Sequence, residues 1–343
     1  MSYYNYTYIR NIPKEFIDRG YKMQKRKKNK MIVLSTIILL CISYFAIGNY
    51  FYNFALNANA EKDFLADNPH LKPSVAINRE REAKEREKDI QFIETVKSTQ
   101  HTIISSDDLK LQLVGTIYEQ ENATKWVVIV HGYTSKSSDM RRWIRHFYEQ
   151  GYNVLAPDLR GHGESEGDYI GMGWHDRLDL LQWLSYLNDV HNNPHTVLFG
   201  ISMGAATVLM ASGEEMPNNV QAIIADCGYS TVFDVFKYQL KDLFGLPPFP
   251  VMNAANTVTK WRANYDLHEA SAVKQVKFNT VPILYIHGDA DTFVPYEMLD
   301  ELYDATTSEK EKLIIEQAGH GEAVRVNPDL YWSTIWAFLA KQM

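Results

Sequence analysis

The sequence predicts an α/β protein with a mainly parallel sheet covered by helices on both faces. Short, continuous apolar runs are typical of strands that are buried on both sides, and they recur along the chain after residue 100. Segments with helical periodicity alternate with these runs, which is the pattern of βαβ units. A chain of 343 residues with 45% hydrophobic and 22% charged residues is also able to bury a sizeable core.

The elements follow in a regular order. An alternating pattern at Leu109, Leu111 and Leu113 predicts a half-buried strand. The continuous strand runs after it are Trp126–Val130, Val154–Ala156, Val197–Phe199, Val220–Ala225, Val281–Ile286 and Leu313–Ile315. The helical segments between them are Asp139–Glu149, Arg177–Leu187, Met203–Ser212, Tyr296–Tyr303 and Leu330–Gln342. Because active residues in such sheets lie on loops at the carboxyl ends of the strands, we expect the chemistry there.

Composition excludes several functions. Residues 1–30 carry nine basic and two acidic residues, a net charge of +7, so the rest of the chain carries −14 of the total of −7. An acidic main body argues against a nucleic-acid partner. The two cysteines form neither a disulfide framework nor a CxxC spacing, and the chain has no HExxH or GxxxxGK[ST] motif. We therefore expect no cofactor and no metal site.

A membrane-spanning helix is predicted near the N-terminus. No residue from Met31 to Ala60 is charged, and about twenty apolar residues span the ~30 Å hydrocarbon core. The basic residues before this run place the N-terminus in the cytoplasm by the positive-inside rule. The resulting organisation is a cytoplasmic tail over 1–30, a single-pass transmembrane helix over 31–54 and an extracellular catalytic domain. The outer aromatic belt of the membrane would consist of Tyr50, Phe51, Tyr52 and Phe54.

A cleaved signal peptide is the alternative, because Ala58-Asn59-Ala60 resembles a cleavage site. The apolar run exceeds the usual signal core, which favours an uncleaved anchor. Residues 55–100 are expected to be a charged linker. Within it, the pairs Glu80–Lys84 and Glu82–Arg86 have i,i+4 spacing and predict a solvated stalk helix, with a partner-binding helix as the alternative.

The strongest catalytic motif is Gly200-Ile201-Ser202-Met203-Gly204, which follows one predicted strand and begins the next helix. A nucleophilic serine must stand clear of the sheet on a sharp turn, and glycines on either side leave room for that turn. This strand–turn–helix context favours Ser202 as a nucleophile over a serine in an ordinary turn.

A base and an acid follow at the ends of later strands. Gly319-His320-Gly321 follows Leu313–Glu316, and histidine has a pKa suited to accepting the serine proton. Asp291, with Asp289 as a substitute, is the candidate that orients the imidazole, and Asp226 is a third possibility. The chain order of serine, acid and histidine is satisfied.

An oxyanion hole requires two backbone N–H donors directed at the tetrahedral intermediate. Met203, the residue after the nucleophile, provides one, and Tyr133 in the loop His131-Gly132-Tyr133-Thr134 provides the other. His131 is expected to fix this loop rather than to transfer protons.

At these sites the sequence resembles the α/β-hydrolase superfamily, over about residues 101–343. The run Asp158-Leu159-Arg160-Gly161-His162-Gly163-Glu164-Ser165 is similar to the family's DxRGxGxS loop, and Asp291-Thr292-Phe293-Val294-Pro295 is similar to its DxxVP run. The second match favours Asp291 over Asp289. The chain looks most like the serine-aminopeptidase-like branch, and especially the membrane-anchored hydrolases of Gram-positive bacteria. The resemblance implies the α/β-hydrolase fold, a triad of Ser202, Asp291 and His320, and an oxyanion hole of Tyr133 and Met203.

The expected function is hydrolysis of carboxylic esters through an acyl-enzyme, on a small-molecule ester or acylated substrate. A serine nucleophile indicates acyl transfer. The apolar run 243–250 in a small cap over about 230–278 is typical of a lid for a hydrophobic substrate, and the alternative is that these residues only pack the cap onto the sheet. Alternatives are an aminopeptidase, with Asp242 and Asp266 holding the substrate amine, and an acyltransferase acting on envelope polymers. A non-enzymatic surface-tethered protein is the alternative from a different class, and the complete set of serine, acid and histidine argues against it.

Overall fold

The computed structural model describes residues 14–66 and 68–343. The chain forms two compact units, Met1–Ile47 and Gly48–Met343. Helix α1 (Lys14–Ala55) contributes to both units. Most of the predicted basic tail is the start of this helix, and residues 1–13 of that tail lie outside the described residues.

The first unit contains a helical segment that is long and apolar enough to cross a membrane, by length and composition. Its large apolar side chains, such as Leu34, Ile38 and Leu39, are exposed. A core helix of a soluble protein would bury these side chains, whereas a membrane-spanning helix presents them to lipid.

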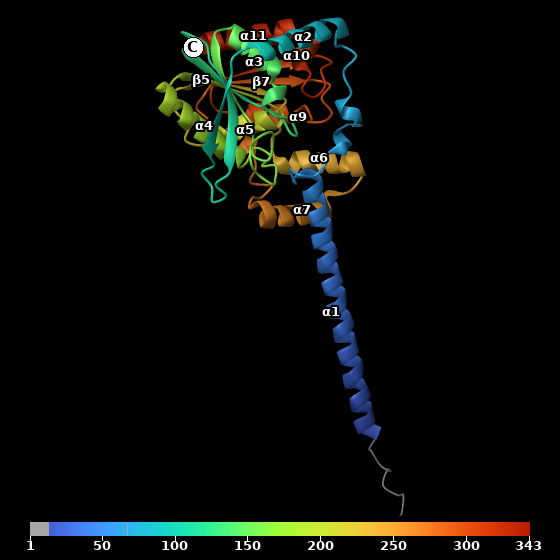
Figure 1. The fold of residues 1–343 in the computed structure, drawn as a ribbon. Helices are drawn as coiled ribbons and strands as arrows, with labels where there is room; N and C mark the ends of the chain where they lie inside the picture. The colour runs from blue at the N-terminus through green and yellow to red at the C-terminus, as the bar shows by residue number, and fades with distance from the viewer. Residues whose placement is uncertain (1–13, 67) are drawn as a thin grey trace, which may run out of the picture. The chain divides into compact units, whose positions relative to one another are not determined.

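The second unit is built around one eight-stranded sheet (Figure 1). Its strands are β1 (Thr99–Ile104), β2 (Gln112–Tyr118), β3 (Lys125–Val130), β4 (Tyr152–Pro157), β5 (His195–Ile201), β6 (Val220–Asp226), β7 (Ile283–Gly288) and β8 (Lys310–Ile315). They lie in the order β1-β2-β4-β3-β5-β6-β7-β8. The pairs β1–β2 and β2–β4 are antiparallel, and all the other neighbours are parallel. The predicted fold class is therefore confirmed.

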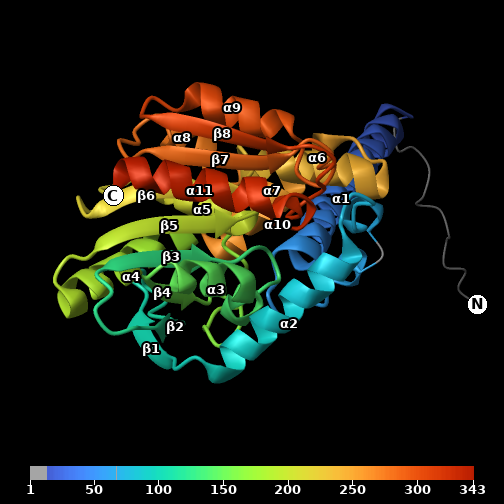
Figure 2. The ribbon, with the colours of Figure 1, turned by 90° about the horizontal axis from the view of Figure 1, so that it is seen from above.

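Helices cover both faces of the sheet (Figure 2). They are α2 (Arg79–Thr95), α3 (Arg141–Glu149), α4 (Asp176–His191), α5 (Met203–Ala211), α6 (Val232–Phe244), α7 (Pro248–Ala263), α8 (Ala272–Gln275), α9 (Glu297–Ala305), α10 (Ala323–Val326) and α11 (Pro328–Gln342). Short 3-10 turns occur at Asp63–Leu65, Pro69–Leu71 and Ser137–Asp139. Alternate residues of β3 show the layers: Val127 and Ile129 pack in the core with α3 and α11, and Val128 and Val130 pack in the core with α4, α5 and α9.

Residues 48–60 belong to this folded unit, which corrects the prediction that the domain starts at 101. Leu56 is 1% exposed in the main core, and its carbonyl accepts a hydrogen bond from Ile170 N at 2.8 Å. Asn57 pairs with Tyr169 in an isolated antiparallel bridge. The end of the predicted span, 48–54, therefore has a second role as part of the domain core.

Three residues of the predicted aromatic belt pack inside the domain rather than standing free. Phe51 and Phe54 each contact the Phe244 ring edge-on, at centroid distances of 5.3 and 5.2 Å, and Tyr52 is buried. Tyr50 is exposed, as an interface residue would be. The same aromatic composition suits a membrane interface and a core, so the sequence pattern did not separate the two.

The predicted solvated stalk helix is also wrong. Helix α2 docks on α3, where Asp89 is 5% exposed and accepts hydrogen bonds from Arg142 Nε at 3.0 Å and from Arg145 Nε at 2.7 Å. Phe92 contacts the Tyr148 ring at 5.3 Å. Its acidic residues therefore pair with arginines of another helix, and α2 is part of the domain.

Candidate active site

Ser202 stands on a strained turn between β5 and α5. Its backbone has φ 54° and ψ −117°, and residues other than glycine rarely adopt a positive φ. The flanking glycines make the turn possible: a Cβ on Gly200 would collide with the Gly204 carbonyl, and a Cβ on Gly204 would collide with the Val130 carbonyl. The Ser202 amide donates to the Asp226 carbonyl at 2.8 Å, which ties the turn to β6.

The structure brings Ser202, His320 and Asp291 into one hydrogen-bonded chain. His320 Nε2 lies 2.8 Å from Ser202 Oγ, and His320 Nδ1 lies 2.7 Å from Asp291 Oδ2. Asp291 is itself held by the amides of Phe293 and Val294, which both donate to its Oδ1 at 2.9 Å. This is the geometry of a nucleophile, a base and an orienting carboxylate.

The electrostatics of the pair fit the same roles. Burial opposes ionisation of Asp291, but His320 and His287 outweigh this effect and hold the pKa of the Asp291 carboxyl below its usual range. Burial also opposes protonation of His320, but the Asp291 carboxylate outweighs it and raises the pKa of His320 above its ordinary value. Asp291 therefore remains ionised and stabilises an imidazolium on His320.

His287 is a neighbour of Asp291 that sequence reasoning missed. It is fully buried at the end of β7, and its Nε2 lies 3.2 Å from Asp291 Oδ2 and 3.1 Å from the Val294 carbonyl. Its position four residues before Asp291, at the end of the same strand, is the signal in the sequence. His287 therefore limits the orientations that the Asp291 carboxylate can adopt.

The two alternative acids have other partners. Asp289 Oδ1 accepts a hydrogen bond from Gln317 N at 2.6 Å, which joins the loops after β7 and β8. Asp226 accepts from Tyr331 Oη at 2.9 Å, and burial raises its pKa to about 6. The structure therefore places Asp291, and neither alternative, in contact with His320.

The segments that carry the two predicted oxyanion amides lie beside Ser202. Met203 begins α5, and a Cβ built on Gly132 would lie 3.4 Å from Ser202 Cβ, so the loop that continues to Tyr133 passes close to the nucleophile. Within residues 14–66 and 68–343, neither the Tyr133 amide nor the Met203 amide donates to a protein acceptor. Both donors are thus available to a ligand oxygen.

The loops around the site are fixed by buried polar groups. His131 Nδ1 donates to the Gly132 carbonyl at 2.8 Å, and its Nε2 accepts from Leu159 N at 3.0 Å. Burial lowers the pKa of His131 to about 4, so it stays neutral and acts structurally, as expected. Arg160, the arginine of the DxRGxGxS loop, forms a bidentate pair with Asp179 of α4, with both N–O distances at 2.7 Å.

The described part of the chain contains one group of three potential metal ligands, Cys227, Asp291 and His320. Burial raises the pKa of the Cys227 thiol to about 11, so it keeps its proton and is a weak ligand. Asp291 and His320 are already bonded to each other. The chemistry of this set fits proton transfer better than metal binding.

A mostly apolar pocket opens at Ser202. It is bounded by three parts of the chain: the loops beside the nucleophile, the cap helix α6, and the segment 54–64, which sequence reasoning had assigned to the span and the linker. The lining residues are Phe54, Ala55, Phe64, Tyr133, Met172, Ser202, Met203, Tyr229, Val235, Phe236, Gln239, Leu243, Phe293 and Val294. Tyr133 Oη donates to the Ala55 carbonyl at 2.6 Å and joins the end of α1 to the oxyanion loop.

The fold and this site define a hydrolase, and comparisons with known proteins give its family. The family model described as the alpha/beta hydrolase fold matches residues 125–250. The chain is 30% identical to the uncharacterized protein YqkD of Bacillus subtilis over 216 residues, which are 62% of this chain and 70% of YqkD. The chain belongs to the α/β-hydrolase family.

Two further similarities concern the membrane and the fold. An uncharacterized membrane protein of Saccharomyces cerevisiae is 24% identical over 245 residues, which cover 70% of this chain and 79% of the yeast protein. Among solved structures, the Pyrococcus furiosus esterase Pf2001 matches with a TM-score of 0.60 and 24% identity, over 73% of this chain and 92% of the esterase. The match to this solved structure supports the fold of the part of the chain that carries the site.

Proposed function

We propose that the protein is a serine hydrolase that cleaves carboxylic esters through an acyl-enzyme, with Ser202 as nucleophile, His320 as base and Asp291 as orienting acid. The observation that carries the proposal is the continuous chain Ser202 Oγ–His320 Nε2 at 2.8 Å and His320 Nδ1–Asp291 Oδ2 at 2.7 Å. An ordinary structural serine has no need of a strained backbone that directs it at a partly buried histidine.

In the proposed mechanism, Ser202 Oγ attacks the ester carbonyl carbon while its proton moves to His320 Nε2. The Tyr133 and Met203 amides donate to the oxyanion. The carbon–oxygen bond to the alcohol then breaks, and His320 returns its proton to the leaving oxygen. Water, deprotonated by His320, attacks the acyl-enzyme and releases the carboxylic acid and the free serine.

An ester substrate is favoured over an aminopeptidase substrate by the surroundings of Ser202. An aminopeptidase needs carboxylates near the scissile bond to hold the substrate amine. Of the two cap candidates, Asp242 pairs with His70 Nε2 at 2.8 Å, and Asp266 bonds Asn256 Nδ2 and Lys260 Nζ at 3.0 and 3.1 Å. Neither carboxylate lines the pocket at Ser202.

We also propose that the first unit anchors the enzyme in the cell membrane as a single span, with the tail 1–30 in the cytoplasm and the catalytic domain outside. The uncharged run from Met31 and the basic residues before it support this placement. In right-side-out vesicles, external protease should digest the domain and leave an N-terminal tag intact. Digestion of the tag with protection of the domain would reverse the orientation.

The activity is tested with the full chain in detergent, on p-nitrophenyl butyrate and on aminoacyl p-nitroanilides. Ser202→Ala should lower kcat on the ester by about 10⁶, and the matched control Ser333→Ala, on the outer face of α11, should leave it unchanged. Serine-dependent cleavage of the anilides would replace the ester proposal with a peptidase. Transfer of the acyl group to an added alcohol in preference to water would replace it with an acyltransferase.

A further inference from the structure

The last turns of α1 form one wall of the substrate region. The segment packs tightly on the cap: a Cβ on Gly48 would collide with the Ala254 carbonyl of α7. Arg262 Nη1 donates to the side-chain oxygens of Asn49 and Asn53, both at 2.8 Å, and its guanidinium lies over the Tyr52 ring at 4.1 Å. The end of the proposed membrane anchor and the cap are therefore one packed structure.

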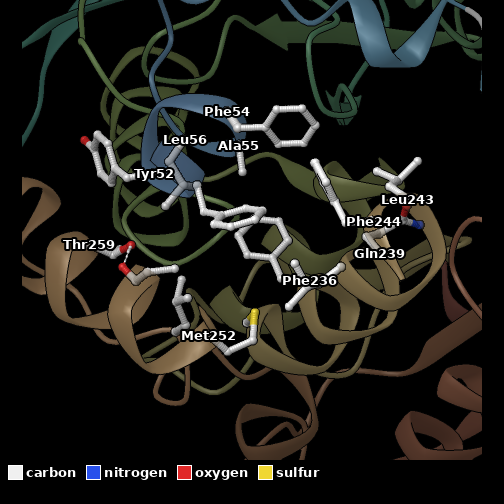
Figure 3. Close-up of a pocket in the computed structure, with 14 residues that line it drawn as sticks. Tyr52, Phe54, Ala55, Leu56, Phe236, Gln239, Leu243, Phe244, Met252 and Thr259 are labelled. Carbon is white, nitrogen blue, oxygen red and sulfur yellow. Dashed lines mark hydrogen bonds between the residues drawn. The ribbon is translucent and has the colours of Figure 1, made fainter. Parts of the chain in front are cut away.

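A second cavity lies between this wall and the cap helices α6 and α7. It is lined by Phe51, Tyr52, Phe54, Ala55, Leu56, Phe236, Gln239, Leu240, Leu243, Phe244, Met252, Ala255, Thr259 and Leu267. Figure 3 shows labelled side chains of α1, such as Ala55 and Leu56, on one side of this space, and labelled side chains of the cap helices, such as Phe236 and Met252, on the other. The cavity shares five lining residues with the pocket at Ser202, namely Phe54, Ala55, Phe236, Gln239 and Leu243. The two apolar spaces are therefore neighbours across a single layer of side chains.

The chemistry of the second cavity suits a hydrocarbon chain. Its polar side chains are few: Thr259 Oγ1 donates to the Ala255 carbonyl at 2.8 Å, and the Gln239 side-chain nitrogen donates to the Phe293 carbonyl. Among the described residues, Gln239 Oε1 is the polar atom of this lining that is buried without a hydrogen-bond partner. The other lining side chains are aliphatic and aromatic, apart from the Tyr52 hydroxyl and the Met252 sulfur. An alkyl chain gains about 0.8 kcal/mol for each methylene that it buries in such a space.

The wall of the cavity follows the proposed span directly in the sequence. Residues within 51–56 line the cavity, and the chain is uncharged from Met31 to Ala60, so no charged linker separates the apolar run from these residues. The cap also exposes apolar side chains on α7: Trp261 is 78% exposed and Phe249 is 73% exposed. Exposed aromatic residues of this kind are typical of a surface that contacts lipid headgroups.

We propose that the substrate is an acyl ester of the membrane in which the enzyme is anchored, and that the cavity between α1, α6 and α7 receives its acyl chain. This inference rests on the proposed esterase function and specifies its substrate class. The chain enters from the bilayer, between the end of α1 and the cap, and the ester group reaches Ser202 in the adjoining pocket. The same bond between Ser202 Oγ and the acyl carbon then forms, and the alcohol leaves.

The test uses the full chain reconstituted in phosphatidylglycerol vesicles, with p-nitrophenyl butyrate in solution and p-nitrophenyl palmitate in the bilayer. Palmitate should be cleaved at least about tenfold faster when it is in the same vesicles as the enzyme than when it is in separate vesicles, because the anchored site takes its substrate from its own bilayer. Equal rates in the two arrangements would overturn entry from the bilayer.

Cavity variants test where the acyl chain lies, through the ratio of kcat/KM for palmitate to that for butyrate. Ala255→Leu fills the cavity and should lower this ratio about tenfold, whereas Asn253→Leu, on the exposed side of the same helix, should leave the ratio unchanged. Phe51→Ala enlarges the cavity and should shift the preferred chain to greater length, which keeps the test decisive if Ala255→Leu does not fold. Unchanged ratios in both cavity variants would overturn the assignment.

The outcomes also separate this inference from the proposed function. Serine-dependent cleavage of butyrate with no cleavage of palmitate in vesicles would leave the esterase in place and overturn the lipid substrate. Absence of cleavage of both esters by a folded enzyme would overturn the esterase and the lipid substrate together.

Discussion

Replacement of Leu56 by alanine tests whether the segment after the anchor is part of the folded domain. Leu56 is 1% exposed, lies in the main core with Ile170 and is followed by residues that pair with Tyr169. A buried Leu→Ala change costs 2–5 kcal/mol in general, and we expect about 2–4 kcal/mol here because one side of Leu56 already faces a cavity. A flexible linker would lose almost nothing from the same change.

The measurement is thermal unfolding of the full chain in detergent, followed by tryptophan fluorescence. At roughly 3 °C for each kcal/mol in a domain of this size, Leu56→Ala should lower Tm by about 6–12 °C. Val75→Ala is the matched control, since Val75 lies in the same segment and is 97% exposed, and its Tm should stay within about 1–2 °C of the wild type. Equal Tm values for Leu56→Ala and the wild type would show that residues 55–60 are not part of the core.

Three further predictions concern the site and its support. Asp291 raises the pKa of His320, so this base is neutral only above the raised pKa, and kcat/KM should fall as the pH falls through it. Asp291→Asn removes the carboxylate and should move this acidic limb of the pH–rate profile to lower pH, while kcat falls by about 10⁴. His287→Phe removes one contact of the Asp291 carboxylate and should reduce kcat by up to about 10² with little change in KM, and an unaltered kcat would make His287 structural only. Arg160→Leu leaves Asp179 buried without its bidentate partner and should cost about 3–5 kcal/mol in chemical denaturation, whereas a stability equal to the wild type would contradict the role of this pair.

The positions of Ser202, Asp291 and His320 could be predicted because their signals are local. Each residue follows a recognisable apolar strand, and the carboxyl ends of parallel strands lie at one edge of a sheet. The glycines around Ser202 reflect close backbone contacts that any such turn requires. The order of the strands in the sequence and the parallel sheet that they predict were therefore sufficient to predict that these three side chains lie close together.

The parts that sequence reasoning missed depend on contacts between distant segments. Strand β1 (Thr99–Ile104) is an edge strand with mostly exposed side chains, so it carries little hydrophobic pattern. The charges of α2 have the spacing of a solvated helix, and their arginine partners lie more than fifty residues away on α3. Likewise, Phe51 and Phe54 line the substrate region, but their local sequence pattern is the same as that of aromatic residues at a membrane surface.

The central claim, that Ser202 is the nucleophile, is tested most directly by covalent labelling. The full chain is treated with a fluorophosphonate, digested and analysed by mass spectrometry, beside Ser202→Ala and Asp291→Asn. We expect one phosphonylated peptide carrying the modification on Ser202, no labelling in Ser202→Ala and much slower labelling in Asp291→Asn. Labelling of Ser202→Ala at the wild-type rate, or modification of another serine in its place, would contradict the account.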